Sequence, residues 1–219
     1  VGGLKELFQP GLRYALFIGL CLAFFNNWTG WSAMGGYIPM LFEMAGVQQR
    51  HVAILQFSLT YLAMALMTVA SMGLIDRVGR RPLWMAASIL MAIITAVTGT
   101  VFHFQVHGPL VLLVIVLCTV PHGLALGGLP WLMMSELFPT RIRAQAVAVT
   151  TTFLWIVIYT CAQLFPMLIG WSQRHIGSPA GAFWIFTLVC FCSTLFGWRM
   201  LPETKGRTLE EIAGSWRKR

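Results

Sequence analysis

The sequence has very little charge, and acidic residues are the scarcest of its charged residues. Asp and Glu together number 7 in 219 residues, and charged residues of both signs make up 10% of the chain, whereas about a quarter of the residues of an average soluble domain are charged. The mean hydropathy is +0.75. This shortage of charge excludes an ordinary soluble domain and predicts a membrane protein.

The sequence also lacks the patterns on which common catalytic and metal sites are built. It has no H-E-x-x-H pair, no glycine-rich phosphate loop and no paired carboxylates within an apolar segment. No basic cluster with interleaved aromatic residues indicates a nucleic-acid partner. Five cysteines lie in apolar segments without metal-ligand spacing, and we interpret them as packing residues: Cys21, Cys118, Cys161, Cys190 and Cys192. We therefore expect neither an enzyme nor a protein that holds a metal or cofactor.

Long apolar segments are what the sequence does contain. A helix needs about 20 residues to cross a hydrocarbon core of roughly 30 Å. Six segments are long enough, at about 13–42, 52–75, 82–102, 109–135, 144–171 and 181–201. Lipid cannot satisfy an open strand edge, and these segments are longer than barrel strands. The sequence therefore predicts an all-α membrane protein, in which a six-helix bundle (13–201) lies between the end of a cytoplasmic loop (1–12) and a cytoplasmic tail (202–219).

The basic residues predict how these helices are oriented. If both chain ends are cytoplasmic, 13 of the 15 Lys and Arg residues lie on the inner side, and only Arg50 and Arg174 lie outside. This is the positive-inside pattern. The inner residues are Lys5, Arg13, Arg77, Arg80, Arg81, Arg141, Arg143, Arg199, Lys205, Arg207, Arg217, Lys218 and Arg219. We expect a multi-pass membrane protein with both ends cytoplasmic and some attraction to anionic membrane lipid.

Three charged motifs follow predicted spans on the inner side. They are DRVGRRPL at 76–83, SELFPTRIRA at 135–144 and PETKGRTLEEI at 202–212. With these motifs at these spacings, essentially the whole chain resembles the second half of a sugar porter of the major facilitator superfamily. The resemblance implies that the six spans are helices 7 to 12 of a twelve-helix fold, and that an N-terminal half supplies helices 1 to 6. The amphipathic opening, VGGLKELFQPGLRY, is likewise typical of a segment that enters a membrane from a preceding domain, so we expect the chain to be a fragment.

The resemblance also implies a function. A sugar porter moves a small polar solute across the membrane by alternating access, so we expect a sugar, a sugar-like molecule or an organic acid as substrate and protons as the coupling ion. The expected location is a plasma membrane, in particular a bacterial inner membrane. The alternative is a substrate sensor or receptor that kept the fold and lost transport. A long signalling tail would favour that alternative, but only 17 residues follow Pro202.

The charged motifs have a physical interpretation of their own. Asp76 lies at the C-terminal end of a predicted helix, where the macrodipole disfavours a carboxylate, so it needs a cation or a helix N-terminus as partner. Glu136 ends the fourth span in a similar setting. The nearby cations are Arg77, Arg80 and Arg81 for Asp76, and Arg141 and Arg143 for Glu136. We expect this cluster to be a conformational gate that holds the inner helix ends together in one state. The alternative is that the arginines only anchor the topology.

Two adjacent asparagines lie inside the first apolar segment. In sugar porters the corresponding helix carries Q-Q-x-x-G-x-N, whose amides bind sugar hydroxyls, and residues 26–32 here read NNWTGWS. The resemblance therefore implies that Asn26, Asn27 and Ser32 contact the substrate. Glycines and a proline interrupt the same helix, and broken helices are tolerated where their backbone faces protein or a water-lined cavity. The alternative is that the amides only join neighbouring helices.

The fourth segment is interrupted as well. Pro121 and Pro130 each remove a helical hydrogen bond, so we expect the helix to bend. The first and fourth spans hold equivalent places in the two three-helix repeats, and paired broken helices indicate a binding site near the midplane. Trp131 aligns with a tryptophan that closes under the substrate in sugar porters. His122 is the only ionisable residue near the centre of a span, so it is either a site residue or an imidazole bonded to a carbonyl that a proline has freed.

Three positions depart from the family pattern. A glutamate of the fourth span is replaced by Gly123, an asparagine of the second span by Met64, and an asparagine beside a fifth-span tryptophan by Leu154. Most of the expected hydroxyl partners in this half are therefore missing. Tryptophans are frequent near the proposed path, at Trp28, Trp31, Trp131 and Trp155. An aromatic or less hydroxylated substrate is thus a hypothesis beside the sugar.

Overall fold

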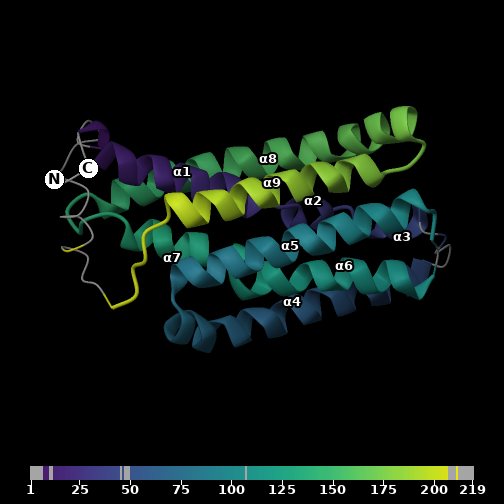
Figure 1. The fold of residues 1–219 in the computed structure, drawn as a ribbon, viewed down its shortest axis with the longest axis horizontal. Helices are drawn as coiled ribbons and strands as arrows, with labels where there is room; N and C mark the ends of the chain where they lie inside the picture. The colour runs from purple at the N-terminus through teal and green to yellow at the C-terminus, as the bar shows by residue number, and fades with distance from the viewer. Residues whose placement is uncertain are drawn as a thin grey trace.

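The computed structural model describes residues 7–9, 12–44, 46, 50–106, 108–206 and 211, and within these ranges all regular structure is helical. The helices run alongside one another in one elongated bundle (Figure 1). Five continuous helical stretches are long and apolar enough to cross a membrane, by length and composition, within the described part of the chain. The predicted all-α membrane fold is confirmed. Much of the predicted loop end (1–12) and tail (202–219), including Lys5, Arg207 and 217–219, lies outside the described residues.

Four of the predicted spans are single helices. They are α4 (Arg50–Val78), α5 (Arg80–His103), α8 (Arg143–Ile176) and α9 (Ala180–Arg199). The starts of α1 and α5 and the ends of α4, α7 and α9 lie at one end of the bundle, on the left of Figure 1. The α3 helix, the α5–α6 connection and the α8–α9 turn lie at the other end. The chain therefore crosses the length of the bundle an even number of times.

The first predicted span is divided into three helices. These are α1 (Leu12–Trp28), α2 (Trp31–Gly35) and α3 (Ile38–Met44). The break after α1 lies at Gly30, whose φ of 111° is in the region that side-chain-bearing residues rarely adopt. A Cβ on Gly30 would also lie 3.2 Å from the ring of Phe186. Backbone conformation and close packing against α9 therefore both require glycine here.

The fourth predicted span is continuous but changes its winding. It consists of α6 (Pro109–Pro121), a π-helical turn η2 (His122–Leu126) and α7 (Leu129–Glu136). The π turn is closed by the N–H of Gly127, which donates to the carbonyl of His122 at 2.8 Å. Such turns are rare and interrupt the regular α-helical ladder. The fourth span therefore contains one wide turn between two proline-containing helices.

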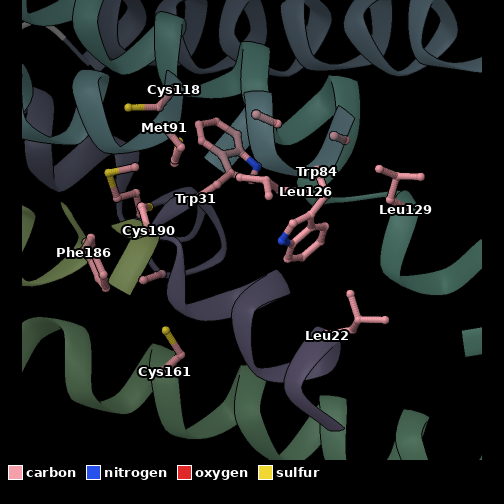
Figure 2. Close-up of a cluster of buried hydrophobic side chains, with 14 of the residues drawn as sticks. Leu22, Trp31, Trp84, Met91, Cys118, Leu126, Leu129, Cys161, Phe186 and Cys190 are labelled. Atoms are coloured by element: carbon pink, nitrogen blue, oxygen red, sulfur yellow. The ribbon is translucent and has the colours of Figure 1, made fainter. Parts of the chain in front are cut away.

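Polar contacts join α5 to α9 in the core. The hydroxyls of Ser88 and Ser193 lie 2.9 Å apart, and the indole N–H of Trp84 donates to the carbonyl of Ser193 at 3.3 Å. Within a membrane, small residues and hydroxyl bonds hold helices together in place of a hydrophobic driving force. The five cysteines are free. Figure 2 draws Cys118, Cys161 and Cys190 among the buried apolar side chains.

The burial is uneven around the bundle. Of the five long stretches, α4 and α8 are the least buried. Large apolar side chains are exposed along both helices, and they include Leu55, Leu62, Leu66 and Val69 on α4, and Trp155, Ile156, Tyr159 and Met167 on α8. These two helices therefore have faces that nothing within the described chain covers.

Candidate functional site

The two predicted substrate asparagines are both buried, and each has its own partners. The side-chain amide of Asn26 donates to the carbonyl of Leu126 at 2.7 Å and to that of Gly127 at 3.1 Å. Asn26 is 5% exposed. Both acceptors lie at the end of the π turn, so Asn26 joins the broken first span to the broken fourth span. This geometry fits the alternative that the amide links helices.

Asn27 has a different arrangement. Its amide nitrogen donates to the carbonyl of Ala23 in its own helix at 3.0 Å. Its side-chain oxygen Oδ1 is buried and has no hydrogen-bond partner in the structure. Buried polar atoms are nearly always paired, so an unpaired one in a native fold needs an explanation. A bound polar molecule is one such explanation.

Ser32 lies just beyond the break, in α2. Its hydroxyl is half-buried and lies 3.5 Å from the carbonyl of Asn26, at the limit of a hydrogen bond. The next residue toward the N-terminus, Trp31, is 3% exposed, and its ring centroid lies 6.1 Å from that of Tyr61 on α4. In Figure 2, Trp31 is drawn in the same buried cluster as Leu126 and Met91. Ser32 thus sits at the edge of a packed aromatic core.

His122 begins the π turn and is 5% exposed. Its ring centroid lies 6.0 Å from that of Trp31. The imidazole Nδ1 is buried without a hydrogen-bond partner. The expected alternative is an imidazole bonded to a carbonyl that a proline has freed; Nδ1 makes no such bond, and the carbonyl of Leu126, four residues before Pro130, accepts from Asn26. His122 therefore presents a second unpaired polar atom close to the two helix breaks.

The four tryptophans do not form one cluster. Trp31 is part of the core, and Trp28 stacks on Phe24 with ring centroids 5.8 Å apart. Trp131 and Trp155 are 44% and 60% exposed. An exposed Trp131 on α7 fits a residue that closes on a substrate from one side. A path lined by aromatic side chains would require the exposed Trp131 of α7 and the exposed Trp155 of α8 to face the same space.

The departures from the family pattern have structural reasons at two positions. A Cβ on Gly123 would lie 2.7 Å from Cβ of Met67 and 3.0 Å from the carbonyl of Met64. The π turn therefore packs directly on the backbone of α4, and a glutamate cannot occupy this place without separating the helices. Leu154 is fully buried in a small apolar cluster with Met134. At both positions, close packing between helices takes the place of the polar side chain that the family pattern predicts.

The charge cluster at the left end of the bundle centres on Arg80. Its guanidinium lies 3.1 Å from Oε1 of Glu136 and 3.4 Å from Oδ1 of Asp76. The Arg80 and Glu136 side chains are 14% and 19% exposed, whereas Asp76 is 77% exposed. The contact with Glu136 is therefore the stronger of the two, because solvent screens the exposed pair. Arg80 joins the end of α4 and the end of α7 at the start of α5.

Sequence reasoning missed one residue of this cluster, Glu203. Its carboxylate accepts from the backbone N–H groups of Arg80 and Arg81, each at 3.1 Å. A carboxylate at a helix N-terminus binds unpaired N–H groups and is favoured by the macrodipole. Its neighbour Thr204 donates to Oε2 of Glu136 at 2.6 Å. The signal was present in the P-E-T motif, but the sequence alone does not bring that motif to α5.

The other predicted gate arginines contact backbone or hydroxyl oxygens. Arg81 donates to the carbonyl of Gly197 at 3.2 Å and to that of Trp198. Arg143 lies 3.5 Å from the carbonyl of Phe138 and donates to the hydroxyl of Thr140 at 3.2 Å. These contacts differ from the predicted pairing of Arg143 with Glu136. Arg77 is exposed, and its carbonyl accepts from Lys205 at 2.6 Å. Unlike these three arginines, Arg80 forms ion pairs with the predicted carboxylates of Asp76 and Glu136.

Comparisons with known proteins agree with this geometry. The family model described as "Sugar (and other) transporter" matches residues 2–216. The chain is 36% identical to the arabinose-proton symporter of Bacillus subtilis over 217 residues, which cover 99% of this chain and 46% of that protein. It is 33% identical to a facilitated trehalose transporter of Drosophila yakuba over 220 residues, covering 94% of this chain and 24% of that protein. The chain therefore spans less than half the length of these relatives.

A solved structure is similar over nearly the whole chain. It is the crystal structure of a double-tryptophan variant of XylE, with a TM-score of 0.88 and 30% sequence identity. The match covers 98% of this chain and 45% of that chain. The helical bundle described above is thus the arrangement found in slightly less than half of that larger protein.

Proposed function

This chain belongs to the sugar (and other) transporter family, and we propose that it is the C-terminal six-helix half of a transporter that moves a sugar or a similar small polar solute by alternating access. The observation that carries this proposal is the contact between two broken helices, α1–α2 and α6–η2–α7, which hold equivalent places in the two three-helix repeats. In transporters of this kind, broken helices in such places form the midplane site. Its relatives are transporters rather than enzymes.

The partner in this proposal is an N-terminal six-helix half. The exposed apolar faces of α4 and α8 support it, because faces of this size need either lipid or protein to cover them. We place both ends of the chain on the cytoplasmic side, on the basis of the positive-inside pattern and of the charge cluster that gathers at that end. A bacterial inner membrane fits the Bacillus relative.

The proposed substrate path runs past the two helix breaks. Asn27 and His122 contribute buried polar atoms without a hydrogen-bond partner, Ser32 is half-buried just beyond the break after α1, and Trp131 is exposed on α7. An amide oxygen and an imidazole nitrogen are good partners for the hydroxyls of a neutral sugar. Asn26 stands apart, since its amide is already bonded to two carbonyls.

The proposed driving force is a proton gradient. One relative is named a proton symporter and another a facilitated transporter, so the family members differ in coupling. The acidic residues of the described spans lie near their ends, as Glu43, Asp76 and Glu136 do. A proton carrier within the membrane would therefore be an acid of the N-terminal half or His122.

The charge cluster around Arg80 is the proposed gate. It joins α4, α5 and α7 with the segment after α9 by ion pairs and capping bonds. Opening the cytoplasmic side would require these contacts to separate, so the described arrangement fits a state that is closed at this end. The arrangement also fits the alternative function, a sensor that switches between the same two states without moving the substrate.

A counterflow assay tests the proposal. The complete transporter, with its N-terminal half, is reconstituted in liposomes loaded with one unlabelled sugar, sugar acid, polyol or aromatic acid, and the uptake of its labelled form is followed. Transient accumulation with one class supports transport and identifies the substrate class. Ligand-induced stabilisation of the purified protein without accumulation would favour the sensor. Vesicles with an imposed pH gradient then distinguish proton coupling from facilitated flux.

A further inference from the structure

Asn26 makes the most direct polar contact between the two broken spans. Its amide nitrogen reaches the carbonyls of Leu126 and Gly127, although Leu126 lies 100 residues further along the chain. The bond to Leu126 is buried and short, at 2.7 Å. The contact therefore has the geometry of a strong hydrogen bond in a place where water is excluded.

The identity of residue 130 explains why the carbonyl of Leu126 needs an outside donor. In an α-helix, the carbonyl of residue i accepts from the N–H of residue i+4. For Leu126 that residue is Pro130, which has no N–H. An unpaired carbonyl in the interior of a membrane protein is costly. The Asn26 amide supplies the hydrogen bond that Pro130 cannot make.

Asn26 lies close to the end of its own helix, α1. The α1 helix ends at Trp28, only two residues later, and the chain breaks at Gly30. The hydrogen bond therefore connects the end of α1 to the end of η2, at the level where both spans are interrupted. Trp131 directly follows Pro130 in the next helix, α7. The contact thus lies one short step along the chain from the segment that holds Trp131.

We propose that Asn26 is a positioning residue that replaces the missing Pro130 N–H, so that the broken first and fourth spans move as one unit during transport. Asn26 does not contact the substrate in this proposal, in contrast to the role that the sequence resemblance implies. The transport part of the inference rests on the proposed function. The structural part, which is the bond between Asn26 and the carbonyl freed by Pro130, does not depend on it.

A double-mutant cycle tests the pairing directly. Asn26→Leu, Pro130→Ala and the double variant are made in the complete transporter, and the melting temperature is measured in detergent. Asn26→Leu alone should lower the melting temperature by about 1 to 4 °C, because a buried carbonyl left unpaired costs about 1 to 3 kcal/mol and the shift per kcal/mol falls as a protein becomes larger. The Pro130→Ala substitution restores a backbone N–H that can reach the carbonyl of Leu126. The same Asn26→Leu change should then cost less than half as much in the Pro130→Ala background.

Asn27→Leu is the matched control, because the Asn27 amide donates to Ala23 within its own helix. Its effect on the melting temperature should be the same in both backgrounds. If Asn26→Leu also has equal effects in both backgrounds, the pairing with Pro130 is wrong. Should Pro130→Ala fail to fold, Asn26→Leu is compared with Asn27→Leu and Asn26→Gln in the unchanged background, since glutamine keeps an amide donor. An unchanged melting temperature for Asn26→Leu would overturn the contact.

Transport kinetics separate positioning from substrate binding. Asn26→Leu should lower the maximal rate of sugar counterflow severalfold while KM and ligand-induced stabilisation stay within twofold of the parent. A loss of sugar affinity in both backgrounds would mean that Asn26 is a ligand after all. If the parent protein moves no solute, the proposed function fails, and the melting-temperature cycle still decides the structural part.

Discussion

Asn26 and Asn27 are neighbours with the same side chain, yet their surroundings assign them different roles. The Asn26 amide is bonded across to the fourth span, whereas Asn27 keeps a buried Oδ1 without a partner. Adjacent residues of a helix point about 100° apart, so they cannot face the same surroundings. The sequence could place both amides at membrane depth but could not tell that one of them bonds across to the fourth span.

For Asn27 we predict a loss of binding with little loss of stability. Replacing Asn27 with Leu removes the free acceptor, and one missing hydrogen bond to a sugar hydroxyl corresponds to roughly a tenfold loss of affinity. The free energy of unfolding should change little, because the Asn27 side chain donates its hydrogen bond to Ala23 within its own helix, α1. Asn27→Gln, which restores the residue of the family, should bind better than Asn27→Leu. Ligand-induced stabilisation of the complete transporter measures this, and equal affinities for all three forms would remove Asn27 from the site.

A second prediction concerns the close packing of Gly123 against α4. A Cβ at this position would meet Cβ of Met67 at 2.7 Å and the carbonyl of Met64 at 3.0 Å. Gly123→Ala should therefore push η2 away from α4 and destabilise the protein by about 1 to 3 kcal/mol, as overpacking does. Gly128→Ala is the control, because a Cβ there has no heavy atom within 4 Å. Thermal unfolding of both variants checks the difference, and equal stabilities would show that α4 adapts without cost.

The helices show how far the sequence alone could be interpreted. Apolar length was sufficient to predict the helical class, because lipid admits few other solutions. Gly30 and the two prolines of the fourth span marked where helices are interrupted. The π turn at His122–Leu126 was beyond prediction, since it depends on how Gly123 and Asn26 pack against other helices. The same holds for Glu203, which caps a helix more than 120 residues earlier in the chain.

The charge cluster around Arg80 gives a prediction about the proposed gate. Arg80→Ala removes a guanidinium that bonds Glu136 in a partly buried site, and hydrogen bonds to charged groups contribute about 1.5 to 3 kcal/mol. The state closed at this end should lose about that much stability, so cysteines introduced on the cytoplasmic side should react at least tenfold faster. Arg77→Ala is the control, because the Arg77 side chain is exposed and its contact with Lys205 is made by the backbone carbonyl. Equal reactivity of both variants and the parent would show that the arginines only anchor the topology.

The bundle considered as one body has a packed core and two faces of exposed apolar side chains. The core between α5 and α9 is well packed, whereas α4 and α8 expose apolar side chains along their length. The unpaired atoms of Asn27 and His122 lie in the first and fourth spans rather than between α5 and α9. A site built at the margin of a half-bundle needs a second half to enclose the solute and to alternate its access.

This arrangement predicts that the six-helix chain on its own does not transport. Reconstituted alone, it should give no saturable sugar uptake, because a solute bound at the first and fourth spans would have no opposite wall and no second body to rock against. Co-expression of the chain with its N-terminal half, as two separate polypeptides, should restore saturable uptake, because the halves meet through packed helix faces. Vesicles that contain either half alone, and vesicles with the intact transporter, are the controls. Saturable, substrate-dependent flux through vesicles that contain this chain alone would show that the described bundle encloses a complete pathway, and the proposal of a half-transporter would then have to be abandoned.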